Sequence, residues 1–504
     1  MGAGLPAQAL ELARSTWDAY RGWWWNTFTD EPQHVIIETF LILFIIWLTF
    51  FQSTTKPYKD TRDVSSLTKK EIDELVADWQ PEPLVKAPPA PAVGADDSGD
   101  REEFVVEKVN GNQLHVAGYR EPLVNFASFD FLGLGQEEEH KEEARLALLH
   151  YGCGSCGPRG FYGTFDVHMK IESEMARFFG TDEGIMYSDA ASAVTSAITA
   201  FAKRGDILMV DEACHEPIWT GVRLSRAHVY RYKHNDMRDL ELKLLQVQEE
   251  DKKLRRDATG HRRFIVTEGL FKNCGDVCDL PAIVRLKERF KYRLILDDTF
   301  GFGVLGDTGR GTCEHHKVPV ASAEVLLASL AHSLCSVGGV CVGSTEVVDH
   351  QRLSGAGYVF SASAPPFVSS VAIKALHLLE AKPERIVRLR ENIQKAQNAF
   401  AGLGACPLVN KSSADSPIQH FSLAPEAVGQ RSHQEVAALL NRLQREVAGK
   451  GFATAVALYS GLKIYNAAPL PAPTLRITLN SRHTETEVTN CMRTLHRAAR
   501  AMRL

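Results

Sequence analysis

The sequence predicts an α/β protein with a mostly parallel sheet wrapped by helices and a smaller α+β segment at the C-terminal end. Three observations predict it. From about residue 104, short apolar runs alternate with helix-length amphipathic stretches, a pattern typical of parallel strands joined by helices. Several runs end in an acidic residue, at Asp211, Glu268 and Asp297. After about residue 385 a long helical stretch follows, and the chain closes with a strand and a helix.

The expected strands of the large domain are short and apolar. They are the runs 184–188, 207–210, 264–267, 294–296 and 325–327. Ligands of open α/β sheets bind beyond the carboxyl ends of the strands. Each acidic residue at a strand end could singly be a turn residue, but as a set they favour a site at this edge.

Composition excludes several classes of protein. The chain has 504 residues, 44% hydrophobic and 24% charged, so it can bury a large core. A net charge of -5 without a long basic run argues against nucleic acid as a partner. The ten cysteines are scattered, which does not indicate a disulfide framework. Cys153 and Cys156 form one CxxC pair without a second, so we expect reduced thiols and no metal site.

An apolar run near the N-terminus predicts a transmembrane helix at residues 35–51, with Glu38 as its single charge. The run rises about 25 Å, close to the roughly 30 Å of a bilayer core. Tryptophans before it suit the lipid–water interface, and the basic residues after it place the large domain in the cytosol by the positive-inside rule. These residues are Trp23, Trp24, Trp25, Lys56, Lys59 and Arg62. A buried core helix is the alternative.

The segments on either side of this run are predicted from their composition. Residues 1–34 mix large apolar and charged side chains, as an interfacial amphipathic helix does, with a frayed terminus as the alternative. Thr68 and Glu71 fit a capping box that opens a short helix through Trp79. Residues 80–103 are rich in proline, alanine and acidic residues, which predicts a linker. The expected divisions are 1–34, 35–51, 52–103, 104–384 and 385–504.

Three segments of the body resemble the α-oxoamine synthases, which are fold-type-I transferases that depend on pyridoxal 5'-phosphate (PLP) and share the aspartate-aminotransferase-like fold. They are a strand and turn at 125–134, a glycine-rich loop at 151–172, and an acidic pair followed by spaced glycines at 296–311. These motifs are long and ordered along about residues 104–500, so they are more specific than a lone glycine motif. Residues 157–168 and 349–367 are most similar to the non-catalytic branch of this family, the long-chain base subunits one of eukaryotic serine palmitoyltransferases, which also carry an N-terminal membrane helix.

The resemblance has consequences for the cofactor. A PLP enzyme needs a carboxylate at the pyridine nitrogen and a lysine for the resting Schiff base. Asp297 stands at the carboxylate position and His215 at the position of the histidine that stacks on the ring. The lysine position is His332, and a second family histidine is Phe300. Because imidazole forms no stable imine, we expect no covalently held PLP and no catalytic residue on this chain, with His332 as a packed side chain.

Two questions remain open at the cofactor positions. Asp297 is either a structural remnant or a contact for weakly bound PLP. Arg476 stands where the family binds the substrate carboxylate, a task that suits its guanidinium. In a chain without the lysine, a structural role for Arg476 is favoured.

The resemblance also implies a dimer with active sites at the subunit interface, to which a lysine-free chain can contribute residues. In the glycine-rich loop, Arg159 would meet phosphate or carboxylate groups, and Cys156 would be a small packed residue. For each position, ordinary dimer packing is the alternative. The residues implied to approach the partner's active site are Cys156, Gly157, Arg159, Tyr162, Ser361 and Ser363.

The function implied by the resemblance is that of a non-catalytic subunit. Its partner, a long-chain base subunit two, would supply the lysine and PLP and condense L-serine with palmitoyl-coenzyme A into 3-oxosphinganine. Small activating subunits, Orm-type regulators and membrane lipid are further expected partners, and the expected location is the endoplasmic reticulum membrane with the large domain in the cytosol. The alternatives are an independent PLP enzyme that uses His332 and a pure membrane scaffold.

Overall fold

The computed structural model describes residues 7–30, 32–50, 68–79, 104–255, 260–459, 462 and 471–502. The chain divides into two compact units, Met1–Arg101 and Glu102–Leu504. The predicted linker at 80–103 and the basic residues Lys56, Lys59 and Arg62 lie outside the described residues. The boundary expected at residue 384 falls at the first residue of a helix of the second unit, Glu384–Ala401, and it stays a prediction.

The described residues of the N-terminal unit form the helices α1 (Ala7–Asp30), α2 (Pro32–Phe50) and α3 (Lys69–Asp78). The predicted capping box of α3 is confirmed, because Thr68 accepts a hydrogen bond from the backbone N–H of Glu71 and the Glu71 carboxylate accepts one from that of Thr68. Helices α1 and α2 contact each other and carry exposed aromatic and aliphatic side chains, among them Trp17, Trp23, Phe40 and Trp47.

The prediction of a membrane-spanning helix at 35–51 needs correction. A helix does form there, but among the described residues no helix is long and apolar enough to cross a membrane. Its first turn is polar and Glu38 follows one turn later, so the apolar stretch without a charge runs from Thr39 to Phe50. That stretch rises roughly 18 Å, against about 30 Å for a bilayer core.

The second unit is built around a seven-stranded sheet in the order β4-β10-β9-β8-β7-β5-β6. Strands β6, β5, β7, β8 and β9 are parallel, and β10 is antiparallel to both its neighbours. The strands are β4 (Glu183–Tyr187), β5 (Ile207–Asp211), β6 (His228–Tyr232), β7 (Arg263–Glu268), β8 (Arg293–Asp297), β9 (Val325–Ser329) and β10 (Gly339–Gly343). All five predicted strands are present, and nearly every residue in them is buried.

Helices surround this sheet, and several begin at an aspartate cap. Asp189 opens α6, Asp236 opens α8 and Asp279 opens α9 by accepting hydrogen bonds from backbone N–H groups of the first turn. Helix α6 packs on β4, β9 and β10. The helices are α4 (Glu138–Tyr151), α5 (Asp166–Phe179), α6 (Ala190–Phe201), α7 (Glu216–Ser225), α8 (Met237–Leu254), α9 (Leu280–Phe290), α10 (Thr312–His315), α11 (Thr345–Ser354), α12 (Ala356–Val359) and α13 (Pro366–Ala381).

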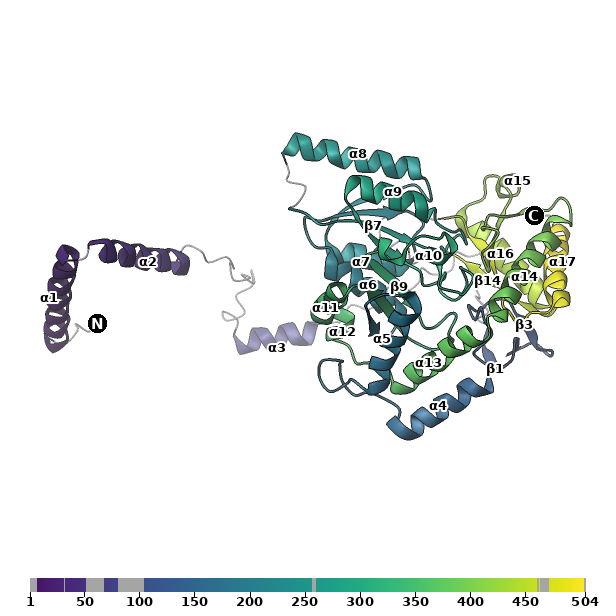
Figure 1. The fold of residues 1–504 in the computed structure, drawn as a ribbon, viewed down its shortest axis with the longest axis horizontal. Helices are drawn as coiled ribbons and strands as arrows, with labels where there is room; N and C mark the ends of the chain where they lie inside the picture. Colours follow the sequence, from purple (N-terminus) through teal and green to yellow (C-terminus); the bar gives the residue numbers. More distant parts are fainter. Residues whose placement is uncertain are drawn as a thin grey trace. The chain divides into compact units, whose positions relative to one another are not determined.

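The C-terminal segment is α+β, as predicted. Its antiparallel sheet has the order β11-β12-β15-β14, and α14 lies beside α17 (Figure 1). The elements are α14 (Glu384–Ala401), β11 (Leu408–Asn410), β12 (Ile418–Leu423), α15 (Pro425–Val428), α16 (His433–Ala448), β14 (Ala455–Ala457), β15 (Thr474–Thr478) and α17 (Glu485–Ala501). One buried cluster joins Leu296 of the large sheet to Phe421 and Ile477 of this segment, so the two share a core.

A third, four-stranded sheet joins distant parts of the chain. Its strands are β1 (Val106–Asn110), β2 (Gln113–Val116), β3 (Leu123–Asn125) and β13 (Phe452–Ala453). The first three form an antiparallel meander, and β13 pairs with β3 in parallel. The start of the second unit is therefore tied to its C-terminal segment.

Candidate functional site

Three buried ionisable residues meet at the carboxyl ends of the central strands. Glu268 ends β7 and Asp297 ends β8, and the two are neighbours in the sheet register. His215 lies just before α7, and its Nε2 is 2.7 Å from Oδ2 of Asp297. Its backbone N–H donates to Glu268 at 2.8 Å. The structure thus brings together His215 and Asp297, the two positions predicted to be retained, and adds Glu268.

The pKa values of this group reflect burial and mutual charge. Burial works to lower the pKa of His215, but the charges of Glu268 and Asp297 and the hydrogen bond to Asp297 outweigh it and raise that pKa. Burial raises the pKa of Glu268 to about 7, although the charge of His215 opposes the rise. The two carboxylates and the hydrogen bond therefore favour the protonated form of the His215 imidazole beside Asp297.

The Asp297 carboxylate has no oxygen left without a partner. Oδ2 bonds to His215, and Oδ1 accepts a hydrogen bond from the backbone N–H of Thr299 at 3.0 Å. A carboxylate that holds a pyridinium nitrogen needs an oxygen directed at that nitrogen. Each carboxylate oxygen has a second lone pair, so the bonds from His215 and Thr299 leave Asp297 able to accept a further hydrogen bond.

The His332 ring is packed among aromatic side chains, which here are called the aromatic surround. Its ring stacks on Phe300 with centroids 4.5 Å apart and planes at 15°, and Phe129 approaches edge-on at 5.3 Å. Burial, with a smaller effect from the charge of His215, lowers the pKa of His332 to about 4. The ring is neutral at pH 7 and cannot form a stable imine. Because an imidazole stands at the position that the family resemblance assigns to the Schiff-base lysine, the residues present do not fit covalently held PLP.

Arg476 belongs to the same surround. It lies on β15, its guanidinium sits 4.1 Å from the centroid of the Phe129 ring, and its Nη2 donates to the carbonyl of Ala127 at 2.9 Å. Burial lowers its pKa to about 10. Within the described part of the chain its Nε has no hydrogen-bond partner. The stacking on Phe129, which also touches Phe300 and His332, ties Arg476 to the aromatic surround.

The segments predicted to face a partner subunit form a second group. The backbone N–H of Ser363 donates to the carbonyl of Gly157 at 2.9 Å, and its hydroxyl donates to the same oxygen at 3.1 Å. Ser155 donates to the carbonyl of Ser363 at 2.7 Å. Ser361 instead bonds to the carbonyl of Gly357 at 2.6 Å. The glycine-rich loop and the segment before α13 therefore hold each other in place.

Arg159, which was predicted to meet phosphate or carboxylate groups at the partner's site, bonds to a carboxylate of its own chain. Its Nη1 and Nη2 donate to the two carboxylate oxygens of Glu172 at 2.7 and 2.9 Å. Only 6% of the Arg159 side chain and 9% of the Glu172 side chain are exposed. Its Nε donates to Thr164 at 3.0 Å, and the guanidinium lies 5.2 Å from the Tyr358 ring centroid. With its donors engaged inside the chain, Arg159 anchors the loop.

Cys156 and Tyr162 lie on the outer side of this loop. Both have left-handed backbone conformations, with φ of 55° and 63°, which cost free energy for residues with a side chain. In the single chain the Cys156 thiol is free and exposed, and Tyr162 and Phe161 are fully and largely exposed. The tight packing expected of Cys156 is thus absent from this chain by itself.

Comparison with known proteins places the chain. The sequence profile of the family "Aminotransferase class I and II" matches residues 121–495. "Long chain base biosynthesis protein 1" of Arabidopsis thaliana is 40% identical over 77% of each chain. "Serine palmitoyltransferase 1" of Dictyostelium discoideum is 37% identical over 90% of this chain and 91% of its own. The chain therefore belongs to the class I and II aminotransferase family and, within it, to the serine palmitoyltransferase 1 proteins.

Solved structures of lower identity confirm the fold of this serine palmitoyltransferase 1 family member. A serine palmitoyltransferase variant from S. paucimobilis with a bound PLP–myriocin aldimine superposes with a TM-score of 0.70 at 22% identity, covering 80% of this chain and 94% of that one. The Sphingomonas wittichii serine palmitoyltransferase superposes with a TM-score of 0.69 at 24% identity. The match covers 80% of this chain and 93% of that one. The expected fold-type-I α/β architecture is therefore confirmed.

The sequence analysis did not predict one cluster of possible metal-binding side chains. His234, Cys274 and Asp276 lie together, although forty residues separate the histidine from the cysteine. The expectation of no metal site was based on the CxxC pair at Cys153 and Cys156, which lies elsewhere in the chain. The spacing of Cys274 and Asp276, two residues apart after a predicted strand, was the only signal available.

Replacing His332 with phenylalanine is expected to make the protein more resistant to acid. The folded state keeps His332 neutral down to about pH 4, whereas in the unfolded chain it takes up a proton near pH 6.5. As the pH falls between these values only the unfolded state gains the proton, so the parent loses stability. Between pH 7.5 and 5, His332→Phe should lose about 2 kcal/mol less than the parent. Denaturant unfolding at both pH values measures the free energy of unfolding. The control is His228→Asn, which replaces an exposed histidine. Equal losses of stability in the parent and in His332→Phe would contradict the prediction.

Proposed function

We propose that this chain is the non-catalytic subunit of serine palmitoyltransferase. It would pair with a lysine-bearing subunit of the same fold, a long-chain base subunit two, in the condensation of L-serine with palmitoyl-coenzyme A into 3-oxosphinganine. Its family membership carries the role in sphingolipid long-chain base synthesis. The division of labour is supported by His332, which the family resemblance assigns to the Schiff-base position and whose ring stacks on Phe300.

PLP, held by the partner, would supply the electron sink for the condensation. This chain would contribute by positioning its glycine-rich loop at the subunit interface and by shielding the interface site from water. Its glycine-rich loop is fixed from within by the Arg159–Glu172 pair and by Ser363. That fixed loop presents Phe161 and Tyr162 outward. Exposed aromatic side chains on a fixed loop are suited to pack against a second subunit and to keep water from a site at the interface.

We also infer attachment to the endoplasmic reticulum membrane, with the second unit in the cytosol. Exposed apolar and aromatic side chains gather on α1 and α2, including Trp23, Trp25, Phe40, Leu43 and Trp47, and such side chains partition into a lipid interface. Small activating subunits and Orm-type regulators would meet the chain in this region. Fractionation of cells that express the full chain or residues 68–504 tests the attachment; equal recovery of both in the membrane pellet would contradict it.

The pairing is tested by expressing the chain alone and together with a lysine-bearing family member. We expect PLP absorbance and serine–palmitoyl-coenzyme A condensation only in the pair. His332→Ala in the pair should keep at least about half of the activity, because a neutral packed histidine takes no part in the chemistry. PLP absorbance and turnover by the isolated chain, both lost in His332→Ala, would instead establish an independent enzyme.

A further inference from the structure

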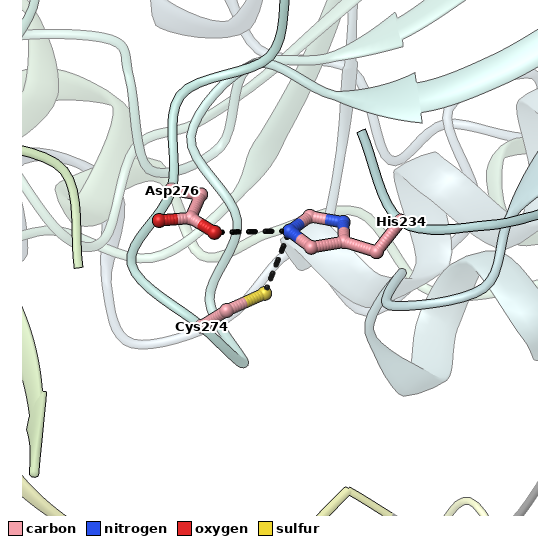
Figure 2. A group of neighbouring side chains, drawn as sticks. All are labelled: His234, Cys274 and Asp276. Atoms are coloured by element: carbon pink, nitrogen blue, oxygen red, sulfur yellow. Dashed lines mark hydrogen bonds and ion pairs between the residues drawn. The ribbon is translucent and has the colours of Figure 1, made fainter. Parts of the chain in front are cut away.

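A histidine, a cysteine and an aspartate converge at the carboxyl ends of β6, β5 and β7. His234 follows β6, and Cys274 and Asp276 lie in the connection between β7 and α9. Figure 2 shows the Nε2 atom of His234 facing both the Asp276 carboxylate and the Cys274 sulfur. Asp211, which ends β5, lies beside the other ring nitrogen of His234, Nδ1. The sheet thus delivers one nitrogen, one sulfur and one oxygen donor to a single point.

The separations of the histidine nitrogen from the other two donors match those in a metal coordination sphere. His234 Nε2 lies 3.1 Å from Asp276 Oδ2 and 3.4 Å from Cys274 Sγ, and the three donor atoms all lie within 4.8 Å of one another. Around a tetrahedral zinc ion, with bonds of about 2.0–2.3 Å, the nitrogen–oxygen edge is about 3.3 Å and the nitrogen–sulfur edge about 3.6 Å. Both observed separations lie within about 0.2 Å of these edges.

The histidine is also held as metal-binding histidines are. Its Nδ1 lies 3.0 Å from Oδ1 of the buried Asp211. A carboxylate at Nδ1 fixes the tautomer and the ring orientation and leaves Nε2 for the metal. Asp211 is itself held in place, because its Oδ2 accepts the backbone N–H of Asn235 at 2.9 Å.

We propose that His234, Cys274 and Asp276 bind a divalent transition-metal ion, with zinc as the best match. Nitrogen, thiolate and carboxylate donors are the set that zinc accepts. The side chains of His234 and Asp276 are 23% and 26% exposed, so water reaches the group and can fill the fourth position. The proposal stands apart from the pairing with a catalytic subunit, because it uses none of the residues assigned to that role.

The ion would clamp the connection between β7 and α9 to the rest of the unit. The Ser412 hydroxyl donates to the carbonyl of Cys274 at 2.9 Å. The Ser413 hydroxyl accepts from the backbone N–H of Val277 at 3.0 Å. The same connection meets the C-terminal sheet, since Tyr459 donates to the carbonyl of Asn273 at 2.7 Å. A metal here would therefore stabilise the contact between the large sheet and the C-terminal segment.

Cobalt titration of the purified full-length chain tests the proposal. After treatment with a chelator, we expect one equivalent of Co²⁺ to bind and to give a thiolate-to-cobalt charge-transfer band that Zn²⁺ abolishes. Cys274→Ser should lose the band, and Asp276→Asn should weaken Co²⁺ binding at least about tenfold. Cys406→Ser, which alters a half-buried thiol outside the group, is the matched control and should keep the band.

A second readout guards against a variant that does not fold. Zn²⁺ should raise the thermal midpoint of the parent and of Cys406→Ser, and leave those of Cys274→Ser and His234→Gln unchanged. No charge-transfer band at saturating Co²⁺, or a band that persists in Cys274→Ser, would overturn the proposal. The group would then be a histidine bridging Asp211 and Asp276 without a metal. Either result is independent of whether the chain forms an active pair.

Discussion

Replacement of Arg159 with methionine should destabilise the second unit by about 3–5 kcal/mol, the range seen when one partner of a buried ion pair is removed. The arginine makes both of its Nη donations to Glu172, and both side chains are almost fully buried. Without the arginine, the Glu172 carboxylate keeps the backbone N–H of Met186 but loses its hydrogen-bonded cation. Denaturant or thermal unfolding of the full chain measures the loss.

Two variants separate this effect from ordinary loss of a surface charge. Arg177→Met removes an arginine that also bonds two glutamates, but its side chain is 51% exposed, so we expect a loss below about 1 kcal/mol. Arg159→Met combined with Glu172→Met replaces both charges with apolar groups and should recover most of the stability. Equal losses in Arg159→Met and Arg177→Met would show that the buried pair contributes no more than a surface pair.

The alanine variant of Gly163 should lower the activity of the subunit pair at least about tenfold, equivalent to about 1.4 kcal/mol in the barrier. A Cβ at this position would lie 1.9 Å from the carbonyl oxygen of Gly157 and 2.7 Å from that of Pro158. Both obstacles are backbone atoms, so the loop must move. Gly157 is the residue that Ser363 holds, and a shift there displaces Phe161 and Tyr162 from the surface proposed to meet the partner.

Gly160→Ala is the matched control for this variant. It lies three residues away in the same loop, and a Cβ added there meets no atom within 4 Å, so activity should fall less than about twofold. Copurification of the Gly163→Ala chain with its partner, at an unchanged thermal midpoint, would separate lost activity from lost assembly. Full activity of an assembled Gly163→Ala pair would favour a scaffold that touches no active site.

Much of the fold could be predicted, because buried parallel strands read as uninterrupted apolar runs. Strands β6 and β10 were missed for different reasons. The His228–Tyr232 strand lies at the sheet edge with a largely exposed first half, so it lacks an apolar run. The Gly339–Gly343 strand begins and ends with glycine, a residue depleted in strands.

The candidate site was predictable in part. His215, Asp297 and His332 could be placed because they follow motifs in chain order, and the direct bond between His215 and Asp297 came only from the tertiary structure. Sequence could not reveal that Arg159 turns toward Glu172, since side-chain direction in a loop depends on packing. The group of His234, Cys274 and Asp276 forms only because β6 and β7 flank β5, an order that no local pattern encodes.

The pairing of β3 with β13 also constrains how the protein is made. Val124 pairs with Phe452, so 328 further residues must be synthesised after Val124 before its partner Phe452 is in place. At 5–20 residues per second this takes roughly 16 to 66 s. Throughout that interval, one edge of the β1–β3 meander waits for a strand that the ribosome has not yet produced. The nascent chain therefore offers chaperones an open sheet edge, and this edge closes only after β13 has been synthesised.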